Sequence, residues 1–143
     1  RGPIINSNYQ TKTPWLFVAG NALHIHDLAD DAYFEGEEAG VAASLFIKDE
    51  LLATSEEIKV EASDGILYVL PNTVSLPLNN EALVLKFRPS KDGINKRVAV
   101  KLDGEVIFKK FYPFLFPSEL ITIKIAKDLV KSGKLLQVEV INE

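Results

Sequence analysis

The sequence predicts a mainly β protein, in which an antiparallel β-sandwich of about seven strands follows a strand, a loop and a helix of α/β character. Two observations support this fold class. From Ile58 onward, short runs alternate apolar and polar residues, and turn signals such as Asp64-Gly65 and Asp103-Gly104 separate them. Before Phe46, the chain is instead rich in Gly and Ala, and most of its charges are acidic.

The amino-terminal part begins with a short apolar run. Trp15–Ala19 stops at a Gly-Asn pair, and a continuous run of this length is typical of a strand buried on both faces. A helix is expected to follow, capped by Asp30 or Asp31 and extending to about Phe46. Strand, Gly turn, loop and helix in this order form half of an α/β unit.

The expected helix has two glycines in its interior, Gly36 and Gly40. A Gly inside a helix costs roughly 1 kcal/mol relative to Ala. Two of them four residues apart are tolerated where the helix must approach a sheet or a ligand closely. We therefore expect this helix to pack tightly on a neighbour.

The remainder reads as strands with one apolar face each. Hairpin-type turns are expected at Asp64-Gly65 and Asp103-Gly104, and a single helical turn at Lys127–Ser132. The expected strands contain residues 58–62, 66–70, 83–88, 97–102, 106–111, 121–125 and 136–140.

Two regions are expected, because periodicity and composition change together. Residues 1–52 are predicted to be a piece of one domain, residues 57–143 are predicted to be the sandwich, and the polar segment Ala53–Glu57 joins them. The chain starts at Arg1 and contains no Met, so we expect it to be a fragment of a longer protein.

Composition excludes several classes of function. The chain has no Cys, which removes disulfides, Cys-ligated zinc and thiol redox chemistry. A net charge of −4 argues against broad nucleic-acid binding. No apolar run approaches the roughly 18 residues of a membrane span, and we expect a cytoplasmic protein. Neither a G-x-G-x-x-G fingerprint nor a G-x-S-x-G elbow is present.

The densest polar cluster is residues 20–31, GNALHIHDLADD, and three interpretations of it remain open. It could be a structural loop in which Asp27 orients a His and an Asp caps the helix. His24 and His26 could form a facial metal triad with a carboxylate. The loop could instead line a cofactor, with Gly20 allowing close approach and the helix N-terminus facing a partly negative atom.

A second unusual stretch is FYPFLF, residues 111–116. It predicts either a strand that crosses between sheets with its aromatic side chains in the core, or an exposed aromatic ridge that docks onto another domain or subunit.

Several short motifs occur in a distinctive order along nearly the whole chain. They are Gly2-Pro3, Thr11 and Thr13, Phe17–Ala19, Gly20-Asn21, His26-Asp27 with Asp30, Ala39-Gly40, Ala42-Ala43, and the weaker Glu61–Pro71, Leu85–Ser90 and Pro117–Leu120. In this order they resemble the C-terminal part of FAD-dependent proteins of the pyridine-nucleotide-disulfide oxidoreductase class. The resemblance is to a subfamily associated with glycerol-3-phosphate dehydrogenase and related amine or amino-acid dehydrogenases.

The resemblance implies cofactor-binding roles for Gly20, Asn21, Asp31 and Ala32. In the family, the residue after the Gly contacts the ribityl or pyrophosphate part of FAD, usually as an Asp, and Asn21 would keep the hydrogen bonding without the charge. The helix start near Asp31 and Ala32 would offer N–H groups to the flavin pyrimidine edge. The redox-active Cys pair of the wider class is not in this chain, so no dithiol chemistry is inferred. No catalytic or metal-ligating residue is assigned.

The resulting hypothesis is a C-terminal fragment of an FAD-dependent, NAD(P)-linked oxidoreductase, which alone is not expected to bind FAD. Its partners would be the rest of the FAD domain, and other subunits of a dehydrogenase complex or a second copy of itself. The alternative is a non-catalytic β-sandwich that acts as a protein–protein interaction module.

Overall fold

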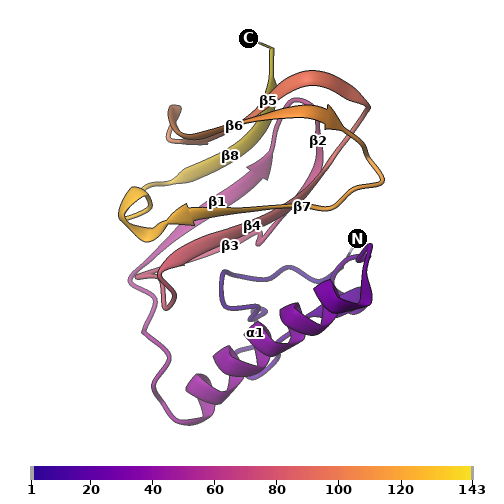
Figure 1. The fold of residues 1–143 in the computed structure, drawn as a ribbon. Coiled ribbons are helices and arrows are strands. Elements are labelled where there is room, and N and C mark those ends of the chain that lie inside the picture. The colour runs from indigo at the N-terminus through magenta and orange to yellow at the C-terminus, as the bar shows by residue number, and fades with distance from the viewer. Residues whose placement is uncertain (1, 143) are drawn as a thin grey trace.

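The protein is mainly β, with two packed sheets and one α-helix. The computed structural model describes residues 2–142 (Figure 1). A five-stranded sheet has the order β3-β1-β8-β5-β6, and a three-stranded sheet has the order β2-β4-β7. The strands are β1 (Glu56–Ala62), β2 (Ile66–Leu70), β3 (Thr73–Leu76), β4 (Ala82–Pro89), β5 (Gly93–Leu102), β6 (Glu105–Leu115), β7 (Ile121–Ala126) and β8 (Leu135–Ile141).

The core lies between the two sheets, and the period-two pattern of the sequence creates it. On β4, Leu83, Leu85 and Phe87 are fully or almost fully buried. Their neighbours on the strand, including Lys86 and Arg88, point to the opposite face. The inner face of β4 thus fills the sandwich, and its outer face is left to contact the amino-terminal part.

The sheet pairing departs from the sequence prediction in detail. The described strands pair antiparallel at every ladder except one, because β1 and β8 run parallel. Asp103-Gly104 joins the antiparallel neighbours β5 and β6, as predicted. Asp64-Gly65 does not make a hairpin, since it carries the chain from β1 in one sheet to β2 in the other. Strand β3 was not predicted. The single helical turn before β8 is present as Lys127–Leu129.

The predicted helix is present as α1 (Ala29–Ile47). Its N-cap is Leu28, which makes no side-chain cap hydrogen bond, so the predicted cap at Asp30 or Asp31 is wrong. Both aspartates lie in the first turn instead, where the helix dipole favours negative charge. No helix in the described part of the chain is long and apolar enough to cross a membrane.

The predicted buried strand at Trp15–Ala19 does not form. Phe17 makes only an isolated bridge with Gln10, and Trp15 is 73% exposed. A strand of this kind needs neighbouring strands on both sides to satisfy its backbone groups. The segment therefore closes on itself, with the Thr11 N–H donating to the Leu16 carbonyl at 2.9 Å.

The amino-terminal segment packs along the three-stranded sheet, between it and α1 (Figure 1). Ile5 and Asn72 exchange hydrogen bonds, with the Ile5 N–H donating to Asn72 Oδ1 and the Asn72 N–H donating to the Ile5 carbonyl, both at 3.0 Å. Ile5, Leu23 and Leu70 form a small second core. The two parts of the chain are therefore in direct contact.

Helix α1 buries only one side. Glu35, Ala39 and Ala42 face the rest of the chain and are buried. Gly36 and Gly40 do not press against a neighbour as predicted, because both are exposed and no atom of another described element lies within 4 Å of where a Cβ would be. The side of α1 that was expected to be in close contact is uncovered.

Candidate functional site: a buried glutamate with two histidines and a lysine

The most deeply buried charged side chain is Glu35, whose exposed fraction is 0%. It lies in the second turn of α1, on the same side as Ala39 and Ala42. This side of the helix faces the loop of residues 20–28 and the outer face of β4. A carboxylate in such a place is costly unless other groups compensate for lost water.

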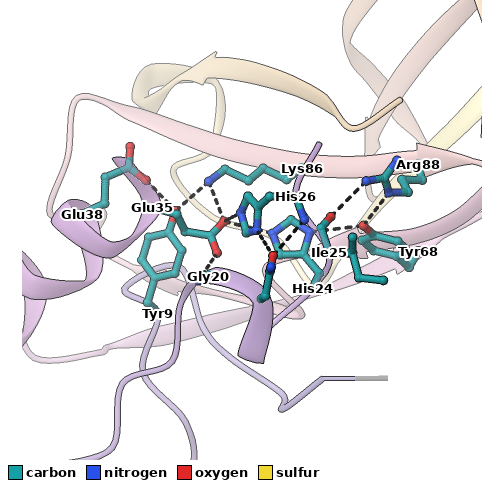
Figure 2. Close-up of polar contacts among 11 residues, drawn as sticks. Tyr9, Gly20, His24, Ile25, His26, Glu35, Glu38, Tyr68, Lys86 and Arg88 are labelled. Atoms are coloured by element: carbon teal, nitrogen blue, oxygen red, sulfur yellow. Dashed lines mark hydrogen bonds and ion pairs between the residues drawn. The ribbon is translucent and has the colours of Figure 1, made fainter. Parts of the chain in front are cut away.

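Both oxygens of Glu35 have partners (Figure 2). Oε1 accepts a hydrogen bond from the backbone N–H of Gly20 at 2.9 Å. Oε2 lies 2.7 Å from Nζ of Lys86, 3.0 Å from Nε2 of His24 and 3.1 Å from Nε2 of His26. One carboxylate oxygen therefore has three nitrogen atoms around it, from a loop and a strand.

These contacts keep Glu35 ionised. Burial alone would raise the pKa of its carboxyl group, but hydrogen bonds from His24 and Lys86 and the charge of Lys86 outweigh it and lower the pKa to about 2. Glu35 is a permanent anion at neutral pH.

The far side of each imidazole ring is also held. Nδ1 of His24 lies 3.2 Å from the hydroxyl of Tyr68 on β2. Nδ1 of His26 lies 3.3 Å from Oδ1 of Asn21, and the backbone N–H of His26 donates to the same oxygen at 3.1 Å. The two ring centroids are 4.3 Å apart. These contacts fix the direction in which both Nε2 atoms point.

A second ion pair flanks the cluster. Arg88 on β4 binds Asp27, donates to the carbonyl of Ile25 at 3.0 Å, and donates to the Tyr68 hydroxyl at 3.2 Å. Oδ2 of Asp27 also accepts from the Leu120 N–H at 2.6 Å. Burial would raise the pKa of Asp27, but the Leu120 N–H and Arg88 together lower it. Asp27 therefore forms an ion pair with Arg88, whereas the structural-loop interpretation expected it to orient a histidine.

The edge of the site opens into a cleft between residues 5–9 and the three-stranded sheet. Glu35 and Lys86 line it, together with apolar side chains such as Leu70 and Leu83. The hydroxyl of Tyr9 donates to Glu38 at 2.5 Å and accepts from Lys86 at 3.3 Å. The cluster is therefore adjacent to a partly apolar hollow.

The four predicted cofactor residues lie around the start of α1. Gly20 begins a short 3-10 turn (Gly20–Ala22) with φ of +67°, a backbone conformation that favours Gly. Asn21 is exposed, and its side-chain oxygen accepts from His26. Asp31 is exposed and Ala32 is half-buried, both in the first turn of α1. Their roles toward FAD stay predictions.

Of the residues that sequence analysis considered for metal ligation, the structure brings together His24 and His26. The carboxylate beside them is Glu35, and the ligand atoms of these three residues all lie within 4.8 Å of one another. Sequence reasoning did not select Glu35, Lys86, Tyr68 or Arg88. The one available signal was the spacing of Glu35, Ala39 and Ala42, which places the glutamate on the small-residue side of the helix.

Three of the four aromatic residues in the stretch 111–116 are exposed, whereas Tyr112 is half-buried against the core. Phe111, Phe114 and Phe116 are all exposed, and the rings of Phe114 and Phe116 stack with centroids 6.2 Å apart. Placing these aromatic side chains in the core was therefore wrong, and the second interpretation describes their position. They lie on and just after β6, an edge strand of the five-stranded sheet.

Comparison of the chain with family models, with curated proteins and with solved structures found no match.

Proposed function

We propose that this chain is the C-terminal part of an FAD-dependent, NAD(P)-linked oxidoreductase. Residues 1–46 would complete the FAD domain, and the sandwich would serve assembly or domain packing. The observation that carries the proposal is the uncovered side of α1. Tyr33, Val41 and Ile47 lie on it and are 68%, 54% and 83% exposed. A helix side with three exposed apolar side chains and two glycines is suited to close packing against the remainder of such a domain.

The start of α1 supports a cofactor at this position. Leu28 provides no side-chain cap, so the first-turn N–H groups are not satisfied by a cap from that residue. Such a helix terminus attracts negative charge, and reduction of a flavin places charge on its pyrimidine edge. The stabilisation would be roughly 0.3–1 kcal/mol at an exposed site and up to ~2 kcal/mol when partly buried.

The Gly20-Asn21 turn would supply the second contact. No described atom lies within 4 Å of a Cβ built on Gly20, so this side of the turn has room for a cofactor. Because His26 already donates to Oδ1 of Asn21, the side-chain Nδ2 would be the group that donates to a ribityl or pyrophosphate oxygen.

The test uses the longer protein that the parent gene encodes upstream of Arg1. Purification should yield one FAD per chain, and NADH or NADPH should reduce it. A gene with no dinucleotide-binding domain ahead of Arg1, or a longer protein without flavin, would overturn the proposal. The chain of residues 1–143 alone should show negligible FAD binding by calorimetry, since most of the cofactor's contacts would lie outside it.

A second candidate function is that of an interaction module, and the exposed ridge of Phe111, Phe114 and Phe116 favours it. The double variant Phe114→Ser, Phe116→Ser should abolish association with a partner subunit on a sizing column. Leu67→Ser is the matched control, because Leu67 is 58% exposed on the other sheet. Unchanged association of the double variant would contradict this function.

A further inference from the structure

The buried cluster has the geometry of a three-ligand metal site. Nε2 of His24 and Nε2 of His26 lie 3.0 and 3.1 Å from Oε2 of Glu35. Ligand atoms that each lie about 2.1 Å from one metal, at octahedral to tetrahedral angles, are roughly 3.0–3.4 Å apart. Both distances to Glu35 fall in this range, and all three ligand atoms lie within 4.8 Å of one another (Figure 2).

The tautomer of His26 determines which of its ring nitrogens can bind a metal. Its backbone N–H donates to the side-chain oxygen of Asn21, which identifies that atom as an acceptor. Its ring Nδ1 faces the same oxygen and must therefore carry a hydrogen. In a neutral ring, Nε2 then presents a lone pair.

That lone pair lies close to another acceptor. The side chain of His26 is 2% exposed, and within the described part of the chain its Nε2 has no hydrogen-bond partner. Oε2 of Glu35 lies 3.1 Å away, in a direction that does not suit a hydrogen bond. A cation would offset the repulsion between two acceptors this close in a buried site, and a metal ion that lies off the line joining them meets the geometry better than a proton.

The surroundings fit ligand roles for both histidines. Histidines that bind metals usually have the second ring nitrogen held by a hydrogen bond, which fixes the ring and its tautomer. Here Tyr68 holds Nδ1 of His24 and Asn21 holds Nδ1 of His26. An ion would take the place of the hydrogen that Nε2 of His24 donates to Glu35, because a histidine releases its proton when it binds a metal. Glu35, the partner that both rings share, also lines the adjacent cleft.

Lys86 decides which ions would suit the site. Its Nζ lies 2.7 Å from the oxygen that would bind the metal. An ionised carboxylate has about four lone-pair sites on its two oxygens, so Oε2 can bind an ion and keep the hydrogen bond from Lys86. The nearby ammonium disfavours hard cations held by charge alone, whereas imidazole ligands favour zinc and other late first-row metals.

We propose that His24, His26 and Glu35 bind one divalent first-row transition-metal ion, such as Zn²⁺. A set of three protein ligands leaves a coordination position for water or a substrate, as in catalytic zinc sites. The proposal rests on the cluster's geometry and is independent of the proposed flavin.

The test titrates the chelator-treated chain with Zn²⁺ by calorimetry and with Co²⁺ by visible absorption. One ion per chain is expected, and His26→Ala and Glu35→Gln should each weaken binding by roughly tenfold or more. Glu37→Gln, an exposed change on the same helix, should leave binding unchanged.

Because Glu35→Gln removes a buried charge that several groups contact, its effect on folding is separated from its effect on binding by a second measurement on the unchanged chain. The imidazole nitrogen resonances of His24 and His26 should shift at Nε2, and not at Nδ1, when Zn²⁺ is added. Absence of stoichiometric Zn²⁺ and Co²⁺ binding, equal binding by His26→Ala, or unshifted Nε2 resonances would overturn the proposal and show that His26 carries a second proton instead.

Discussion

Lys86 of β4 and Glu35 of α1 form an ion pair of 2.7 Å that joins the sandwich to the amino-terminal part. The two residues are 51 positions apart in the chain, and both side chains are largely buried. The pair is one of the contacts that give the amino-terminal part a fixed place on the sheet.

Lys86→Met should destabilise the chain by about 3 kcal/mol, because it leaves the carboxylate of Glu35 buried with less compensation. Urea unfolding gives the change in free energy. Lys124→Met is the matched control, since Lys124 is exposed on the neighbouring strand β7, and it should change stability by less than about 0.5 kcal/mol. Equal effects of the two changes would contradict a stabilising role for the pair.

Acid should weaken the fold through Glu35. The pKa of this carboxyl group is about 2 in the folded chain against 4.5 ordinarily, so unfolding takes up a proton between these values. Its contribution, on the order of 3 kcal/mol, is present above pH 4.5 and is lost as the pH falls toward 2. Unfolding of metal-free wild type and Glu35→Gln at a series of pH values should show two stabilities that converge in acid. A constant difference would rule this linkage out.

Arg88→Met should loosen the loop that carries both histidines, because Arg88 binds Asp27 and the Ile25 carbonyl. We expect a loss of roughly 2–3 kcal/mol and faster amide exchange across residues 23–28. Lys59→Met, which removes an exposed pair with Glu61, serves as the control. If exchange across residues 23–28 stayed slow, the loop would owe its position to other contacts.

Tyr33→Ser with Val41→Ser tests the uncovered side of α1. Both side chains are exposed, so the chain of residues 1–143 should unfold within about 0.5 kcal/mol of wild type. The longer flavoprotein that the proposed function requires should nevertheless lose flavin content, measured after release of the cofactor, because packing against the rest of the FAD domain would fail. Full retention of flavin would show that this side is not an internal contact.

Periodicity predicted the strands well where one face is buried. Leu83, Leu85 and Phe87 alternate with polar residues, and all three lie in the core. It missed β3, because four residues between two prolines are too short to show a period. It also misread Asp64-Gly65, since a turn signal says nothing about which sheet the next strand joins.

The candidate site was only half visible in the sequence. The loop of residues 20–31 stood out by its polar density, but its partners did not. Lys86 reads as an ordinary polar residue of an alternating strand, and Glu35 reads as a residue that favours the helix dipole. Only the fold brings Lys86 and Glu35 to the loop. In the folded chain the carboxylate beside the two histidines is Glu35, rather than Asp27. Exposure of Phe114 was equally hidden, because a strand sequence does not reveal whether its sheet edge is covered.

Lys86 and Arg88, the two cations that bind the amino-terminal part, lie two residues apart on the same face of β4. Inserting or deleting a single amino acid between Leu83 and Lys86 would rotate them inward together and expel core side chains in exchange. The contact between the amino-terminal part and the sandwich therefore depends on which face of β4 each residue occupies. A substitution on β4 keeps this alternation of faces, whereas an insertion or a deletion reverses it.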